Sequence, residues 1–361
     1  MREDQGAQDP RTESDVTGQA SGPDPVDAHT NAATGSSAGA SVVSEDLSDA
    51  AEIVETPLET APGEEERETT AKLSIQELTA GWKDLEEQKP ELSVTIRFGA
   101  KTNLGRVREN NEDKFDFFVP EQTHILAARG CLYAVADGMG GHAAGQIASE
   151  YALNVVIRAF YSDTQSDLEQ ALRSAIEQAN LLIHEAANAM PDRNQMGTTL
   201  TCAVIREDDL YIGQVGDSRG YLFREGELRQ ITEDHSWVAE QVKRGAMTPE
   251  EAECSPFRNY ITRSLGTVPE VEVDIYHEKL QEDDVILLCS DGLSGMISDA
   301  EIADTLANRA PSLSTLMLVE QANSAGGRDN VTAVVLQIQA IEPFEKKKGF
   351  RWPGAGKPAR K

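Results

Sequence analysis

The chain has 361 residues, of which 39% are hydrophobic and 5% aromatic, which is enough apolar material for one large domain with polar extensions. Its 33 basic and 62 acidic residues give a formal net charge of −29, so general binding to nucleic acids or anionic lipids is not expected. No apolar run approaches the roughly 18 residues of a membrane span, and the acidic start Met1-Arg2-Glu3-Asp4 is unlike a signal peptide. We therefore expect a cytoplasmic protein.

The first 90 residues contain 21 acidic and 6 basic residues and few large apolar side chains, so we expect a disordered acidic arm over 1–90. Apolar residues at roughly helical spacing in Leu73–Trp82 leave a short helix or a docking segment as the alternative there. An acidic run precedes Thr69 and Thr70. This pattern resembles the phosphothreonine segments bound by forkhead-associated domains, so a phosphosite with such a partner is one hypothesis and a solvated linker is the other.

A compact domain is expected over residues 93–341, followed by a flexible tail over 346–361 that contains seven basic residues. The capping-box patterns Ser166–Glu169 and Ser298–Glu301 predict helices, the first of which runs to about Ala189. Six apolar runs have the length and composition of buried strands: Cys131–Ala136, Leu200–Ile205, Leu210–Val215, Tyr221–Phe223, Val285–Cys289 and Val331–Ile338. Helices together with strand pairs predict an α+β layered domain.

The four cysteines are at least 35 residues apart, which fits neither a metal or redox pair nor a dense disulfide framework. Free thiols in a reducing compartment are therefore expected. Cys131, Cys202 and Cys289 lie in apolar runs and are expected in the core. Cys254 is expected in a loop, where redox sensitivity is the alternative to an inert thiol.

Aspartates stand at the ends of the predicted strands: Asp137, Asp217 and Asp291 follow apolar strands, and Asp329 precedes one. If a sheet gathers these four at one rim, their charges repel by several kcal/mol at an effective dielectric near ~20 unless cations neutralise them. Oxygen ligands without a Cys or His pair favour Mg²⁺ or Mn²⁺ over Zn²⁺. The alternative is that each Asp-Gly or Asp-Asn pair is only a turn.

Two further segments favour the metal interpretation. The bare backbone of Gly138-Met-Gly-Gly141 lets carbonyl groups approach an ion closely. Arg108 offers a planar fork for phosphate oxygens, and Glu112 and Asp113 are suited to hold metal-bound water. The alternative for this second segment is a surface charge cluster.

With these segments in view, the chain is similar to the metal-dependent Ser/Thr protein phosphatases of type 2C, the PPM family, in its bacterial form. The resemblance implies a four-layer α/β/β/α sandwich of two antiparallel sheets flanked by helices, with two Mn²⁺ or Mg²⁺ ions at one end. Eight matching blocks occur in the family's order: Arg108–Asp113, Asp137–His142, Met196–Leu200, Gly213–Arg219, Thr232–Ser236, Ile261–Gly266, Ser290–Gly292 and Gly327–Val331.

The resemblance also implies the metal ligands, position by position. Asp137 is expected to bridge both ions, and the Gly138 carbonyl to bind one of them. Asp291 and Asp329 are expected to bind the other ion. Asp217 together with Asp291 is expected to hold a weaker third ion.

The implied reaction is the hydrolysis of phosphoserine and phosphothreonine in proteins by direct attack of a metal-bridging hydroxide. Arg108 is expected to grip the substrate phosphate, and Glu112 and Asp113 to act through metal-bound water. Such an enzyme opposes Ser/Thr kinases, and we expect it to be a monomer. The alternatives are a catalytically weak module that binds phosphoproteins, or a phosphatase dedicated to one regulatory partner.

The sequence departs from the family pattern in two places. Met139 stands where many eukaryotic relatives have a histidine that is proposed as the general acid, which leaves the acid unassigned; His142 is a candidate, with a loop-packing role as the alternative. The segment 236–260 resembles the family's flap, but Glu253-Cys-Ser255 stands where relatives often have a His-Pro pair. We expect His235 to pack or cap rather than to bind a metal.

Overall fold

The computed structural model describes residues 81–82, 89–141, 143–189, 196–307 and 309–344. The predicted phosphosite at Thr69 and Thr70 and the predicted basic tail lie outside the described residues, as does almost all of the predicted acidic arm. His142 is outside them as well, so its role stays a prediction.

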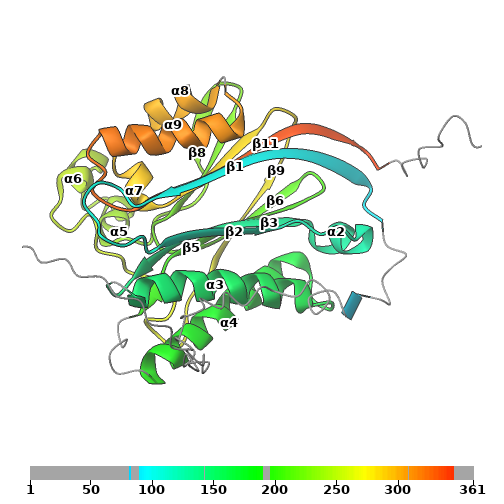
Figure 1. Ribbon diagram of the computed structural model, residues 1–361, viewed down its shortest axis with the longest axis horizontal. Helices are drawn as coiled ribbons and strands as arrows, with labels where there is room; N and C mark the ends of the chain where they lie inside the picture. The colour runs from blue at the N-terminus through cyan, green and yellow to red at the C-terminus, as the bar shows by residue number, and fades with distance from the viewer. Residues whose placement is uncertain (1–80, 83–88, 142, 190–195, 308, 345–361) are drawn as a thin grey trace, which may run out of the picture. The chain divides into compact units, whose positions relative to one another are not determined.

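Two antiparallel sheets lie face to face between two layers of helices (Figure 1). One sheet has the strand order β1 (Leu92–Asn103), β11 (Val331–Pro343), β10 (Val285–Cys289), β7 (Arg219–Arg224) and β8 (Glu227–Gln230). The other has the order β2 (Asp113–Phe118), β3 (Cys131–Met139), β5 (Leu200–Arg206), β6 (Asp209–Val215) and β9 (Asp274–Lys279), with β4 (Gly197–Thr198) paired to β3. This arrangement confirms the predicted α+β four-layer sandwich.

The helices cover the outer faces of the sheets (Figure 1). The sheet that contains β3 is covered by α3 (Ala143–Ser162) and α4 (Leu168–Ala189), and the sheet that contains β11 by α7 (Asp291–Ser294), α8 (Asp299–Ala307) and α9 (Pro311–Ser324). The remaining described α-helices are α2 (Thr123–Arg129), α5 (Trp237–Lys243) and α6 (Pro249–Cys254). No helix in the described part of the chain is long and apolar enough to cross a bilayer.

Local details of the predicted elements differ in two places. Ser298 and Glu301 form the predicted capping interaction, but at α4 the cap is Asp167, whose carboxylate accepts from the Gln170 amide at 2.8 Å. Ser166 lies one residue before this cap, and its carbonyl accepts a hydrogen bond from Arg129. Cys254 is exposed as predicted, but it is the last residue of α6 rather than a loop residue.

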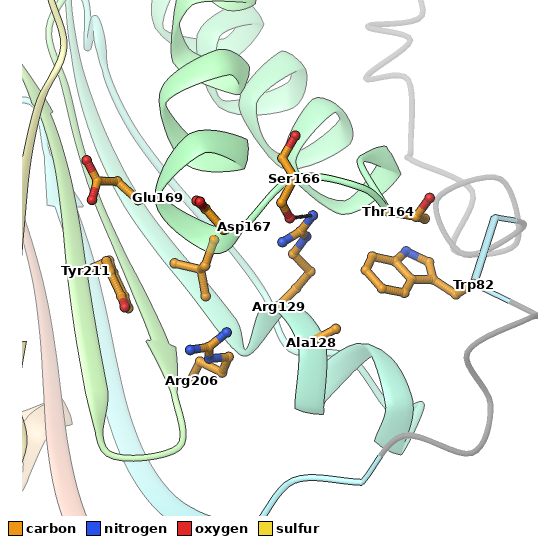
Figure 2. A pocket seen from close by; sticks show the side chains of 10 residues that line it. Trp82, Ala128, Arg129, Thr164, Ser166, Asp167, Glu169, Arg206 and Tyr211 are labelled. Atoms are coloured by element: carbon orange, nitrogen blue, oxygen red, sulfur yellow. Dashed lines mark hydrogen bonds between the residues drawn. The ribbon is translucent and has the colours of Figure 1, made fainter.

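Trp82, at the end of the segment singled out as a helix or docking element, is packed against the domain. The indole is 1% exposed, its Nε1–H donates to the Tyr161 carbonyl at 2.7 Å, and the Arg129 guanidinium lies 5.5 Å from its ring centroid. Figure 2 shows Trp82 and Arg129 beside a cavity of about 440 Å³. Since Tyr161 lies 18 residues beyond Ala143 on α3, this cavity is about 27 Å along the helix from the strand ends that carry Asp137.

We expect Trp82→Ala to destabilise the domain by about 3 kcal/mol and to lower Tm by roughly 6–12 °C, because removal of the buried indole leaves a cavity. Deletion of residues 1–90 is expected to lower Tm similarly while peptide hydrolysis stays largely intact. Thermal melts and phosphate-release assays of both proteins measure these effects. Deletion of residues 1–67 is the matched control. A Trp82→Ala protein with the same Tm as this control would contradict the prediction.

Candidate active site

The pairing of β2 with β3 places two of the predicted site residues side by side. Asp113 and Asp137 are partners in the antiparallel register. Strand β3 continues past Ala136, where the sequence predicted its end, because Gly138 and Met139 pair with β4. Thr199 fixes the Asp137 backbone, since its Oγ1 accepts from the Asp137 amide at 3.0 Å and its own amide donates to the Asp137 carbonyl at 2.8 Å.

The other sheet contributes Asp291 and Asp329 to the same place. Asp291 begins α7 directly after β10, and Asp329 directly precedes β11, the neighbour of β10 in the sheet. The two segments touch at Gly292, where a Cβ atom would lie 1.9 Å from the Asn330 carbonyl oxygen and 3.3 Å from the Asp329 Cβ. The charges of Asp291 and Asp329 both act on the Asp137 carboxyl, which lies close to them. The structure therefore brings together the three aspartates on which the predicted metal pair depends.

Asp217 joins this cluster from the turn between β6 and β7. Its side chain is 7% exposed, and the nearby charge of Asp291 adds to the cost of ionising it. Thr199 also contacts this turn, because its Oγ1 lies 2.8 Å from Ser218 Oγ. One threonine thus links the Asp217 turn to the Asp137 strand.

Burial and mutual repulsion disfavour the ionised forms of these carboxyls. Desolvation, followed by the charge of neighbouring aspartates, raises the pKa of Asp217 to about 8 and that of Asp291 to about 6. For Asp113 desolvation raises the pKa to about 7 despite the hydrogen bond from Ser290. The pKa of Asp137 is raised well above its usual range, through desolvation and the charges of four other aspartates. A bound cation offsets this repulsion by supplying positive charge at the carboxylates.

The donor set fits a hard divalent cation. Asp113, Asp217 and Asp291 each leave the Oδ1 atom buried without a hydrogen-bond partner among the described residues. Carboxylate oxygens are the ligands that Mn²⁺ and Mg²⁺ prefer, and an orphaned buried oxygen is costly unless something binds it. The residues present therefore suit the predicted ions.

The ligand shell is not closed in this conformation. Among the described residues no three Asp, Glu, His or Cys side chains are arranged to hold one ion. Asp329 is engaged by Arg108, whose Nη2 donates to Asp329 Oδ2 at 2.6 Å. This hydrogen bond, partly offset by desolvation, also raises the pKa of the Arg108 guanidinium. The buried oxygens without partners and the mutual repulsion of the carboxyls nevertheless suit a cation.

Arg108 and Glu112 lie beside the carboxylate cluster. The Arg108 side chain is 53% exposed, so a phosphate in solvent can reach it. The Gly138 amide donates to the Glu112 carbonyl at 3.2 Å, and the charge of Glu112 contributes to the raised pKa of Arg108. The structure thus places a cationic fork directly beside the carboxylates.

Three polar residues that support this cluster were not singled out from the sequence. Ser290 donates to Asp113 Oδ2 at 2.6 Å, and Asn330 accepts from the Glu112 amide and donates to the Leu104 and Asn110 carbonyls. Thr199 is the third, through the contacts described above. Two of them adjoin a motif aspartate in the chain, which is a sequence signal for a supporting role.

Comparison with known proteins decides the family. The family model described as Protein phosphatase 2C matches residues 105–329. The chain belongs to this family. It is 38% identical to the "Serine/threonine phosphatase stp" of Listeria welshimeri over 247 residues, which are 67% of this chain and 96% of that protein. It is 39% identical to "Serine/threonine protein phosphatase PstP" of Mycobacterium tuberculosis over 247 residues, 68% of this chain but 46% of that protein.

Solved structures agree with this membership. The catalytic domain of PstP in complex with two manganese ions matches with a TM-score of 0.60 at 38% identity, covering 69% of this chain and 100% of that structure. The Streptococcus agalactiae serine/threonine phosphatase matches with a TM-score of 0.63 at 35% identity, covering 68% of this chain and all of that one. The predicted family and enzyme class, a protein phosphatase of type 2C, are confirmed. The two manganese ions of the PstP structure agree in number and kind with the ions expected from this sequence. The role of each site residue stays a prediction.

Proposed function

We propose that this enzyme hydrolyses phosphoserine and phosphothreonine in cytoplasmic proteins, opposing Ser/Thr kinases, by direct attack of water on phosphorus. The observation that carries the proposal is the cluster of five mutually repelling aspartates beside one exposed arginine. The relatives named as serine/threonine phosphatases support the substrate class. The absence of disulfides among the four described cysteines is consistent with a reducing compartment.

We assign the two principal ions to the Asp137 carboxylate, the Gly138 carbonyl, Asp291 and Asp329, and a weaker third ion to Asp217 with Asp291. When bound, such ions lower the pKa of a shared water toward neutrality and offset the negative charge of the phosphoryl group. The protein's part is to hold the ligands in place. The strand register and the Thr199 hydrogen bonds do this for Asp137.

Glu112 and Asp113 are assigned to ordered water around the ions rather than to the ions themselves. Ser290 accepts from the Thr332 amide at 3.0 Å while it donates to Asp113, so the Asp113 carboxylate has a fixed orientation. One oxygen of Asp113 remains for a water molecule. Arg108 is assigned to the substrate phosphate, for which its planar N–H donors are matched.

The direct test uses purified full-length protein with phosphothreonine and phosphoserine peptides. Phosphate release is expected with Mn²⁺ and is expected to stop when EDTA is added, with no phosphorylated enzyme trapped by rapid acid quench. If Mn²⁺ supports no release and EDTA changes nothing, the alternative of a phosphoprotein-binding module replaces this proposal. A trapped phosphoenzyme would overturn the direct mechanism alone.

We expect Arg108→Ala to raise KM for a phosphopeptide by about tenfold or more, because a charge-assisted hydrogen bond to phosphate contributes about 1.5–3 kcal/mol. Arg108→Lys is expected to recover only part of this loss, since an ammonium cannot bind phosphate with two parallel donors. Steady-state kinetics measure both effects. Arg328→Ala, which removes an exposed arginine beside Asp329, is the matched control. An equal rise in KM for this control would contradict the assignment of Arg108 to the substrate phosphate.

A further inference from the structure

Asn180 is a buried polar residue of α4 whose side chain bonds to the backbone of a loop distant in the sequence. It is 1% exposed. Its Oδ1 accepts a hydrogen bond from the Gly266 amide at 2.8 Å, and its Nδ2 donates to the Val268 and Pro269 carbonyls at 3.0 Å and 3.1 Å. One side chain therefore holds three backbone groups of the segment 264–269, which we call the support loop.

A second side chain, one helical turn further along α4, holds the other polar group of Gly266. The Nδ1 atom of His184 lies 3.1 Å from the Gly266 carbonyl oxygen, and Asn188 donates to His184 Nε2 at 2.9 Å. Because Nε2 accepts, Nδ1 carries the proton and donates to the carbonyl. Gly266 has a φ of +86°, and a Cβ atom there would lie 2.3 Å from the Ile183 Cγ2 atom. The support loop is thus bonded to α4 and packed directly against it.

The support loop is the outer neighbour of β4, a strand of only two residues. Leu265 and Thr198 pair in both directions: the Thr198 amide donates to the Leu265 carbonyl at 3.1 Å, and the Leu265 amide donates to the Thr198 carbonyl at 2.8 Å. Residues 266–270 belong to no helix or strand. The bonds from α4 are therefore what anchors the loop beside β4.

Strand β4 connects this support to two of the assigned metal ligands. Thr198 is the register partner of Gly138, and its Oγ1 donates to the Asp137 carbonyl at 2.9 Å. Gly138 is closely packed against α3 as well, since a Cβ atom there would lie 2.1 Å from the Gly145 carbonyl oxygen. The end of β3 is consequently held between α3 and β4, and Asn180 holds the loop that supports β4.

We propose that Asn180 is a positioning residue that holds the Asp137–Gly138 backbone in place for a divalent ion, through the support loop and β4. This rests on the proposed function, in which the Asp137 carboxylate and the Gly138 carbonyl bind the principal ions. A carbonyl ligand belongs to the main chain, so its position relative to an ion depends on the backbone and not on a side-chain rotamer. Residues that orient the ligands of a metal contribute to its affinity without touching it.

Three substitutions and one control test this role. Asn180→Leu removes all three bonds at similar volume. In His184→Asn the amide nitrogen stands near Nδ1 and keeps the donor for Gly266, whereas in His184→Gln it stands near Nε2 and loses that donor. Leu172→Ala is the control, because Leu172 is a fully buried α4 residue that contributes to the core.

Three measurements are made on the full-length proteins. Calorimetric titration with Mn²⁺ gives the affinity of each binding step. Steady-state kinetics at saturating Mn²⁺ give kcat and KM for a phosphothreonine peptide. Amide hydrogen exchange at Thr198 and Leu265 in EDTA reports on the pairing of β4 without any ion.

In Asn180→Leu we expect one of the tight Mn²⁺ steps to weaken about tenfold and kcat to fall about tenfold, while the weakest step changes less than about twofold. KM for the peptide is expected to stay within about twofold, because Arg108 is assigned to the phosphate and lies outside this path. Exchange at Thr198 and Leu265 is expected to become faster in EDTA. His184→Gln is expected to show the same changes at about threefold, and His184→Asn to match wild type.

Leu172→Ala is expected to lower Tm while it leaves kcat and the Mn²⁺ affinities within about twofold of wild type. If Asn180→Leu loses stability alone, as this control does, Asn180 supports the fold and not the ion, and the proposal is overturned. Equal weakening of all Mn²⁺ steps contradicts the path to Gly138. If Asn180→Leu does not fold, the His184 pair decides, since equal kcat and equal affinities in His184→Gln and His184→Asn overturn the proposal.

Failure of the proposed function has a different signature. A wild-type protein that binds no Mn²⁺ and releases no phosphate removes the assigned ions, and the positioning role of Asn180 with them. In that case faster exchange at Thr198 in Asn180→Leu still reports the structural link from α4 to β4. A wild type that binds Mn²⁺ beside an Asn180→Leu protein with unchanged affinities and unchanged kcat overturns the positioning role alone.

Discussion

Asp137→Asn is expected to retain less than about 0.1% of wild-type turnover, a loss of about 4 kcal/mol or more in transition-state stabilisation. The substitution preserves shape but removes the charge at the centre of the carboxylate cluster. The charges of Asp113, Asp291, Asp217 and Asp329 all act on Asp137, which is why we propose it as a principal ion ligand. Steady-state phosphate release with Mn²⁺ measures the loss.

The fold is expected to survive this change, because the hydrogen bonds that fix residue 137 use its backbone. Without Mn²⁺ the variant is expected to be at least as stable as wild type, since one of several repelling charges is gone. Asp116→Asn is the matched control: Asp116 lies on β2 three register pairs from Asp113, and burial raises its pKa too. An Asp137→Asn enzyme with near-normal turnover, or an equally inactive Asp116→Asn enzyme, would refute the assignment.

The sequence predicted the buried strands well because those strands carry an unbroken apolar signal. Val285–Cys289 is buried at every position and was predicted with its observed bounds. Longer strands that were missed are half-exposed: β1 alternates between intermediate and exposed positions over most of its length, and β9 carries charged residues such as Asp274. Their place in the sheets depends on pairing with β11 and β6, which is tertiary information.

The site followed from sequence to the extent that its residues adjoin buried strands. Asp137, Asp291 and Asp329 were predicted to converge because the ends of paired strands meet at one edge of a sheet. Their convergence from two different sheets came from the family resemblance, since strand lengths alone do not say which sheets pack together. The salt bridge from Arg108 to Asp329 had no sequence signal, because 221 positions separate the two residues.

For Trp82 the sequence left two interpretations open. The acidic composition predicted a disordered arm, and the spacing in Leu73–Trp82 kept a helix or docking segment as the alternative, because a single large aromatic weighs little in an average over the arm. The Trp82 indole contacts Tyr161 and Arg129, which come from segments far away in the sequence. Trp82 also lies outside the region matched by the family model, so family resemblance gave no hint of it.

Removal of divalent ions is expected to make the stability of the protein fall as the pH rises from about 4 to about 8, and this fall can be followed between about pH 5.5 and pH 8.5. The pKa values of Asp291, Asp113 and Asp217 in the fold are about 6, 7 and 8, all above the roughly 3.9 of an unfolded chain. A group with a raised pKa in the fold contributes stability that is fully present below its unfolded pKa and is lost as pH rises through its folded pKa. Each of these three carboxyls therefore destabilises the ion-free fold increasingly between its unfolded and its folded pKa, because over this interval the unfolded chain has released a proton that the fold still binds.

The expected size is a fall in Tm of roughly 10 °C for EDTA-treated protein over this range, since a few kcal/mol is spread over about 250 residues. Other carboxyls act in the opposite sense only at lower pH: Asp209 and Asp274 have depressed pKa values and lose their contribution as acid protonates them. The window above pH 5.5 thus isolates the cluster. Added Mn²⁺ is expected to raise Tm most at the alkaline end, because ligands that are already deprotonated bind it better.

Asp217→Asn provides the sharpest check on this interpretation. In EDTA at pH 8 the variant is expected to melt several degrees above the wild type, because it lacks a buried charge that the fold cannot neutralise. With Mn²⁺ in excess the difference in Tm between the two proteins is expected to shrink or to change sign, because only the wild type gains the ion assigned to Asp217. Differential scanning calorimetry at pH 5.5, 7 and 8.5 measures all four cases. A wild-type Tm that is flat across this range in EDTA and unmoved by Mn²⁺ contradicts the view that these carboxylates are held together for a cation.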